Sequence, residues 1–70
     1  MNEPYEDLRK LSPGRIAHRI KEYRERQGIT QETLANRLGI KRWTLIRWEK
    51  AKVRVSNIML RMLIDAGVLG

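Results

Sequence analysis

Two tryptophans stand five residues apart among basic side chains in GIKRWTLIRWEKAK, residues 39–52. Arginine can donate two hydrogen bonds to the O6 and N7 atoms of guanine, and apolar side chains can contact the methyl group of thymine. Successive side chains of an α-helix are about 100° apart, so one side of this stretch carries both kinds of group: Arg42, Trp43, Ile46 and Arg47. We therefore expect these four residues to read base edges in the major groove of duplex DNA.

The opposite side of the same helix is expected to pack inside the domain. It carries Thr44, Leu45 and Trp48, and their partners are the apolar residues of the preceding segment: Leu34, Ala35, Leu38 and Ile40. Two alternatives stay open, since Trp43 could fold back onto the turn before its helix and the arginines could contact phosphates or be solvated. The coherent stripe favours base reading, because solvent does not stabilise an exposed Ile46.

Basic residues cluster around this helix. The chain carries 15 Lys and Arg against 8 Asp and Glu, a net charge of +7, and Glu49 is the only acid between residues 41 and 54. Such a local excess attracts polyanions, most often nucleic acid, although net charge also serves solubility. A helix that begins at Gln31 would aim its N-terminal N–H groups at a phosphate. We expect phosphate contacts from five residues: Gln31, Lys41, Lys50, Lys52 and Arg54.

Composition argues against several other classes of protein. Seventy residues make one domain, and the chain has no cysteine and a single histidine, so we expect no disulfide, metal site or cofactor. His18 has no nucleophile or carboxylate at a catalytic spacing, so we expect no enzyme. The sequence has no apolar run of membrane-spanning length, and the stretch MNEPYEDLRK is more charged than we expect of a signal peptide. We therefore expect a cytoplasmic, nucleoid-associated protein that does not bind membranes.

The positions of capping residues and glycines along the chain predict helices and no strand. Ser12-Pro13 starts a first helix that Gly28 ends, and Thr30 caps a second that ends at Gly39. Two more follow over residues 42–50 and 57–66, giving a compact all-α domain of four helices. Those at 31–49 form a helix-turn-helix. We expect the domain to span residues 12–70, and residues 1–11 to be a partly ordered arm with at most one extra helical turn.

The stretch RIKEYRERQGITQETLANRLGIKRWTLIRWEKAK resembles the Cro and phage-repressor class of helix-turn-helix domains, the XRE-like family. The resemblance rests on the arginine of YRE, the TQETLA core, the glycine that opens the turn and the closing RWE. It implies a lambda-repressor-like fold that binds duplex DNA sequence-specifically, usually as a homodimer and in transcriptional control. It also implies that Gln31 holds a phosphate, that Arg42, Trp43 and Arg47 read bases, and that Arg24 and Glu49 form an internal ion pair.

The ion pair can also be argued from the residues. A free Glu49 among six bases would repel phosphates, so we interpret it as a structural partner of Arg24. The sequence departs from the family at Lys41, where a small capping residue is common, and at Val55, where proline is frequent. Ala51 stands in place of a common glycine, from which we expect a longer recognition helix. We expect no counterpart of the fifth helix found in many relatives, so the mode of dimerisation stays open.

The segment 57–66 is apolar nearly all round, wider than one packed face requires. We expect its remainder, with Val68 and Leu69, to be exposed and to form a homodimer or partner interface through Ile58, Met59, Met62 and Leu69. The alternative is that the small core uses this surface, with Tyr5, Leu8 and Leu11 of the arm covering the rest.

Three functions are compatible with these patterns. The first is a dimeric, sequence-specific transcriptional regulator, a repressor in our interpretation. The second is an antitoxin-like or adaptor protein that binds a protein partner through residues 57–66 and DNA secondarily. The third is a non-specific DNA or RNA binder, which the apolar members of the reading face disfavour, because phosphate binding alone requires no apolar group.

Overall fold

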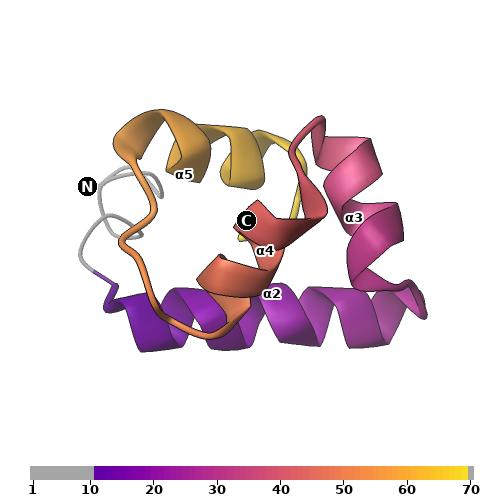
Figure 1. The fold of residues 1–70 in the computed structure, drawn as a ribbon, viewed down its shortest axis with the longest axis horizontal. Helices are drawn as coiled ribbons and strands as arrows, with labels where there is room; N and C mark the ends of the chain where they lie inside the picture. Colours follow the sequence, from indigo (N-terminus) through magenta and orange to yellow (C-terminus); the bar gives the residue numbers. More distant parts are fainter. Residues whose placement is uncertain (1–10, 70) are drawn as a thin grey trace.

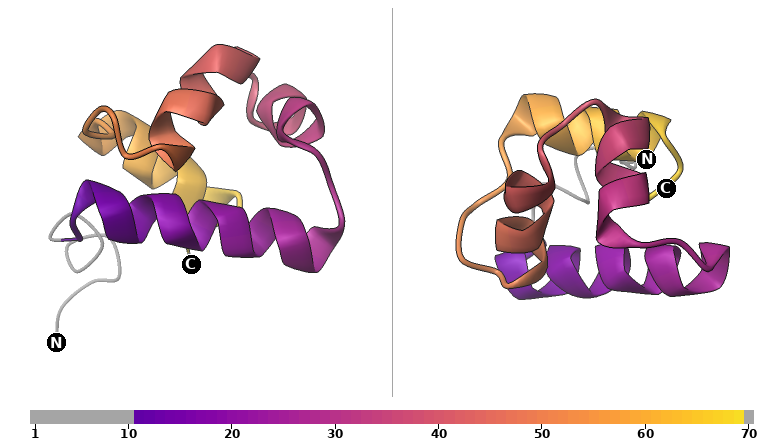
Figure 2. Two further views of the ribbon diagram at one scale, coloured as in Figure 1. Left: turned by 60° about the horizontal axis from the view of Figure 1, so that its bottom comes forward. Right: turned by 45° about the vertical axis from the view of Figure 1, so that its right-hand side comes forward.

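The computed structural model describes residues 11–69, and these form four helices and no strand. The helices are α2 (Pro13–Gln27), α3 (Gln31–Leu38), α4 (Arg42–Glu49) and α5 (Asn57–Asp65). Figure 1 shows α2 and α5 along opposite edges of the molecule, with α3 spanning between them at one end and α4 in the middle. In the left view of Figure 2, α3 and α4 lie above α2, so α4 covers one face of the molecule. The all-α prediction is confirmed.

Side-chain caps and glycines set most of these boundaries. Ser12, Thr30 and Ser56 each accept a hydrogen bond from the backbone N–H three residues ahead, at 3.2, 3.1 and 3.3 Å. Each bond satisfies one of the N–H groups that the first turn leaves unpaired. Gly28 and Gly39 end α2 and α3 in the left-handed conformation, which costs a residue without Cβ little.

The prediction that Ala51 extends the third of these helices is wrong. Helix α4 ends at Glu49, and Ala51 adopts a left-handed φ of 57°. The Ala51 N–H donates to the carbonyl of Trp48, and the Lys52 N–H donates to that of Arg47, each at 3.1 Å. This is the hydrogen-bond pattern of a glycine-terminated helix with alanine in the glycine's place. The tertiary position of the chain overrides the preference of alanine for the right-handed helix.

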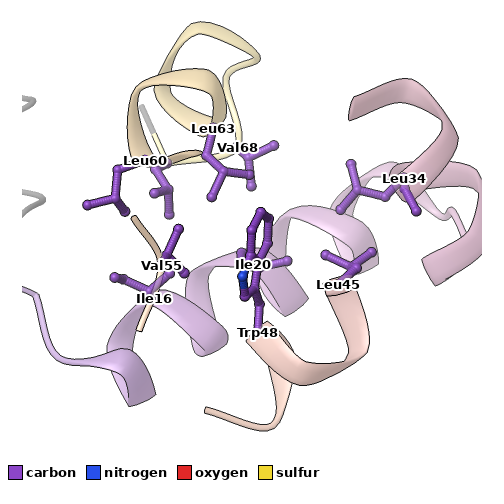
Figure 3. Packing of buried hydrophobic residues seen from close by; sticks show 11 residues of the cluster. Ile16, Ile20, Leu34, Leu45, Trp48, Val55, Leu60, Leu63 and Val68 are labelled. Carbon is purple, nitrogen blue, oxygen red and sulfur yellow. The ribbon is translucent and has the colours of Figure 1, made fainter. Parts of the chain in front are cut away.

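One apolar core joins all four helices. Figure 3 shows Ile16 and Ile20 of α2, Leu34 of α3, Leu45 and Trp48 of α4, and Leu60 and Leu63 of α5 converging with Val55 and Val68. The Trp48 ring is only 5% exposed and reaches from α4 into the middle of the cluster. Trp48 is therefore a core residue, as predicted.

The C-terminal segment does not have the exposure that we expected. Val68 and Leu69 are both buried, although the sequence suggested that they would be available to a partner. After α5, Gly67 takes a φ of 80° and reverses the chain, and the N–H groups of Val68 and Leu69 donate to the carbonyl of Leu63 at 2.9 and 3.3 Å. The turn folds both side chains back into the core, so Leu69 is a packing residue here.

Two predictions concern the N-terminal side. Leu11, assigned to the arm together with Tyr5 and Leu8, is half-buried and packs against the core. Tyr5, Leu8 and the rest of residues 1–10 lie outside the described residues.

Within residues 11–69, no helix has the length and apolar character needed to cross a lipid bilayer.

Candidate nucleic-acid interface

The short turn at residues 39–41 sets α4 at an angle to α3 and against α2. The Ile40 N–H donates to the carbonyl of Ala35 at 3.0 Å, which closes α3 and directs the chain into α4. Lys41 occupies the N-cap of α4 in an extended conformation, and its side chain makes no capping hydrogen bond. This departure from the usual capping residue leaves Lys41 exposed, with its charge available at the start of the helix.

The two sides of α4 divide as the sequence predicts. Leu45 and Trp48 are buried, whereas Trp43 is 55% exposed, and Arg42 and Arg47 are exposed with it. Ile46 is half-buried, so it belongs only in part to the open surface. We refer to Arg42, Trp43, Ile46 and Arg47 as the reading face.

Within the reading face, an arginine and a tryptophan are already in contact. The guanidinium carbon of Arg47 lies 5.6 Å from the centre of the Trp43 ring, one helical turn away. At this distance the cation is attracted to the ring quadrupole, worth about 0.5–1 kcal/mol at an exposed site. The contact favours an arrangement in which the two side chains lie together on the surface of α4.

Behind the reading face, Glu49 accepts hydrogen bonds from two other helices. Arg24 of α2 donates from Nε to Oε2 at 2.7 Å and from Nη2 to Oε1 at 2.8 Å. Gln31 of α3 donates from Nε2 to Oε1 at 3.2 Å, and Arg24 Nη1 donates to the carbonyl of Ile29 at 3.3 Å. Glu49 is only 3% exposed. The predicted ion pair is therefore present between α2 and α4, and the hydrogen bond from Gln31 links α3 to it.

The same contacts raise the pKa of Arg24 above the ordinary arginine value. Hydrogen bonding to Glu49 is the largest cause, opposed by partial burial and aided by the charges of Glu49 and Glu25. Because arginine already titrates far above neutrality, the guanidinium stays charged under all ordinary conditions.

The bond from Gln31 to Glu49 was missed by the sequence analysis. The two residues are 18 positions apart and no motif spacing connects them, so only the packing of α3 against α4 brings them together. The side-chain amide has two N–H donors, and the bond to Glu49 uses one of them. Gln31 also lines an open hollow of about 690 Å³ at the start of α3, together with Thr30, Glu32 and Arg42. Gln31 and Arg42, predicted to contact phosphate and base, thus share one surface.

The remaining predicted phosphate residues lie at both ends of α4. Lys41 precedes the helix, whereas Lys50, Lys52 and Arg54 follow it, and all four are exposed. Lys50 and Lys52 line a second hollow, of about 540 Å³, against the N-terminal half of α2. Arg54 lines neither hollow.

Helix α5 carries the candidate partner surface. Ile58 is 80% exposed, which is unusual for a large aliphatic side chain, whereas Met59 and Met62 are half-buried against the core. Ile58 and Met62 line a shallow hollow with Arg61 and Asp65. Since Leu69 is buried, the predicted interface is reduced to one face of α5.

Groups of acidic, histidine or cysteine side chains that could hold a metal ion do not occur in the described part of the chain.

Comparison with known proteins gives one family match and two relatives. A family model described as helix-turn-helix matches residues 20–66, which include α3, α4 and α5 and the C-terminal half of α2. Two proteins named uncharacterized HTH-type transcriptional regulators are similar to the chain. One, from Archaeoglobus fulgidus, is 45% identical over 38 residues, 54% of each chain. The other, from Methanothermobacter thermautotrophicus, is 45% identical over 40 residues, 57% of this chain and 58% of that protein.

The chain thus spans just over half the length of these curated relatives. No solved structure matches it.

Proposed function

The chain belongs to the helix-turn-helix family, and from this premise we propose that it is a transcriptional regulator that binds double-stranded DNA sequence-specifically. In this proposal α4 enters the major groove with the reading face towards the bases. The observation that carries it is the division of α4, which exposes Arg42, Trp43 and Arg47 while Leu45 and Trp48 hold the helix in the core.

Each member of the reading face has a chemical role in the proposal. Arg42 and Arg47 donate hydrogen bonds to guanine O6 and N7, which is the commonest specific contact to a base. Trp43 and the exposed part of Ile46 pack against thymine methyl groups. The Trp43–Arg47 contact supports this role, because side chains that are already ordered lose less conformational entropy on binding.

Phosphate contacts position the helix. We assign them to Gln31, whose second N–H is not used by Glu49, and to the cations at the two ends of α4: Lys41, Lys50, Lys52 and Arg54. Such contacts fix register and supply most of the affinity but carry no sequence information. In this scheme the Arg24–Glu49 pair is structural. Arg24 neutralises the negative charge of Glu49, which would otherwise repel phosphates.

Repression is the output that we propose, because an occupied promoter site blocks access without further machinery. We also propose that the protein acts as a homodimer through the exposed face of α5, centred on Ile58 and Met62 with Met59 beside them. A two-fold pair would place its recognition helices about 34 Å apart, one turn of DNA.

A second candidate function is supported by the same exposed isoleucine. An adaptor or antitoxin-like protein would use Ile58 and Met62 to bind a different protein, and DNA only secondarily. Light scattering on the purified chain separates the two, because a stable dimer supports the regulator, whereas a monomer supports a missing partner.

Selection of bound sites from a pool of random duplexes tests the proposed function most directly. We expect the pool to converge on one sequence made of two inverted half-sites containing both G·C and A·T pairs. A pool that stays random while the protein still binds would leave only non-specific binding and overturn the assignment of the reading face.

A further inference from the structure

A basic hollow lies where the N-terminal half of α2 meets the turn that follows α4. It has a volume of about 540 Å³ and we call it the lysine hollow. Residues more than 25 positions apart line it: Gly14, Ala17, His18 and Lys21 of α2, with Glu49, Lys50, Ala51 and Lys52. The sequence predicts that Lys50 and Lys52 contact phosphates of DNA but predicts no function for α2 at this point.

The charge of the lysine hollow is not neutralised from within. Lys21, Lys50 and Lys52 are all exposed on its walls. The one carboxylate among its lining residues is Glu49, which is buried and already accepts hydrogen bonds from Arg24 and Gln31. The lysines therefore face an open space with no acidic side chain in its lining free to pair with them, which favours an anion there.

Small residues and an unusual backbone conformation leave the space of the hollow open to solvent. Gly14 and Ala17 present almost no side chain towards α4, and a Cβ built on Gly14 would meet only the Ser12 hydroxyl, at 3.9 Å. On the other side, the left-handed conformation of Ala51 reverses the chain, so that Lys52 follows α4 closely and lines the hollow. A compact, highly charged group with several oxygens fits such a space, and the ammonium groups of lysine bind phosphate as point charges.

We propose that the lysine hollow binds a phosphate of the DNA backbone, with Lys21 of α2 as a contact in addition to Lys50 and Lys52. The inference rests on the proposed function. Helix α4 has eight residues and is therefore about 12 Å long, close to the width of about 12 Å of the major groove. The hollow of about 690 Å³ that Gln31 and Arg42 line lies at the first residue of α4. The lysine hollow lies directly after the last residue of α4. A helix lying across the groove brings these two hollows to the phosphates of the two strands that border it.

The test compares two exposed cations of α2 in the full chain. Lys21→Gln removes a charge from the lysine hollow, whereas Arg26→Gln removes the same charge from a residue that does not line it. Dissociation constants on the selected duplex are measured from about 50 to 200 mM salt. We expect Lys21→Gln to flatten the slope of log K against log salt by about 1, as for the loss of one phosphate contact. Arg26→Gln should keep the wild-type slope.

Two results would overturn the inference. One is an unchanged slope for a Lys21→Gln variant that melts cooperatively like the wild type. The other is an equal loss for Lys21→Gln and Arg26→Gln, which would mean that only net charge matters. If the wild-type chain itself bound duplexes with no salt dependence, the proposed function would fail first, and that outcome is distinct from both.

A second measurement separates a backbone phosphate from a free phosphate compound. Inorganic pyrophosphate is titrated into the wild-type chain and followed by the amide resonances of residues 14–21 and 50–52. On our proposal these resonances shift on adding duplex DNA, and excess pyrophosphate competes with the duplex. Saturation by pyrophosphate together with an unchanged DNA slope in Lys21→Gln would assign the hollow to a free phosphate ligand and overturn the backbone assignment.

Discussion

Arg24 and Glu49, 25 residues apart, form a two-pronged ion pair with donor–acceptor distances of 2.7 and 2.8 Å. The pair fixes the tilt of α4 relative to α2, and the additional bond from Gln31 fixes α3 to both. The orientation of the reading face therefore depends on side chains that lie beneath it, and of these we expect only Gln31 to contact DNA as well.

Removing one partner of this pair should destabilise the fold strongly. Arg24→Met leaves the Glu49 carboxylate buried without its cation, which costs about 3–5 kcal/mol; the partial exposure of Arg24 places the expected value at the lower end. Arg26→Met, an exposed position two residues along α2, should cost less than about 1 kcal/mol. Urea denaturation measures both. A double variant, Arg24→Met with Glu49→Met, should recover much of the loss, and equal losses for Arg24→Met and Arg26→Met would contradict the structural role.

Replacing Ala51 by glycine should stabilise the protein. A residue with a Cβ in the left-handed conformation costs about 1–2 kcal/mol, and the greater freedom of glycine in the unfolded chain offsets part of this gain. We expect a net increase of about 0.5–1 kcal/mol in the free energy of unfolding. Ala66→Gly is the matched control, because Ala66 caps α5 with a right-handed φ of −80° and should be destabilised by glycine. Thermal melting compares the two, and a lower midpoint for Ala51→Gly would be inconsistent with strain there.

Base reading and phosphate binding should separate in two variants. Arg42→Ala is expected to cost about 1–3 kcal/mol on the selected duplex and to relax its base preference. Lys52→Ala should weaken selected and random duplexes alike and flatten the salt slope by about 1. Binding titrations on both duplexes over a salt series make the comparison. If both variants lost the same affinity on both duplexes, Arg42 would be another phosphate contact.

The two tryptophans should report different environments. In Trp48→Phe the remaining Trp43 is 55% exposed, so its fluorescence should be quenched by iodide and should change on adding duplex DNA. In Trp43→Phe the remaining Trp48 is 5% exposed and should respond to neither. Circular dichroism checks that Trp48→Phe, which removes core volume, remains folded. A Trp43 signal indifferent to DNA would exclude it from the reading face.

A charge at Ile58 should dissociate the proposed homodimer. Ile58→Glu places two carboxylates opposite each other at a two-fold interface, and we expect light scattering to give a monomer at concentrations where the wild type is dimeric. Asn36→Glu adds the same charge at an exposed position of α3 and should leave the mass unchanged. A wild-type chain that is monomeric throughout would favour the adaptor alternative instead.

Local signals in the sequence were sufficient for the elements and for the sides of α4. Ser12 and Thr30 cap helices where predicted, because the hydroxyl of a capping residue bonds to a backbone N–H only three residues ahead in the sequence. Helical periodicity predicted the burial of Trp48 and favoured the exposure of Trp43, for which packing on the preceding turn was the alternative. Among contacts between residues far apart in the sequence, the Arg24–Glu49 pair could be predicted, because an isolated acidic residue in a basic segment requires a partner.

Other features depend on tertiary packing and carry no local signal. We expected Leu69 to be available to a partner, but a turn at Gly67 returns it to the core. The direction of a chain after a glycine is not set by its neighbours in sequence. The left-handed Ala51 contradicts the intrinsic preference of alanine, so no propensity argument could find it. The Gln31–Glu49 bond depends on how closely α3 approaches the end of α4.

Because α4 is short, one copy of this domain can recognise only a short DNA sequence. The eight residues of α4 make about two helical turns, and the four side chains of the reading face can contact about four base pairs. A four-base-pair sequence recurs about every 250 base pairs by chance. This is far too often to distinguish one binding site from the roughly 10⁶–10⁹ competing sites of a genome. A unique DNA target must therefore contain several such short sites. They are bound by several copies of the domain side by side, or by this protein together with another.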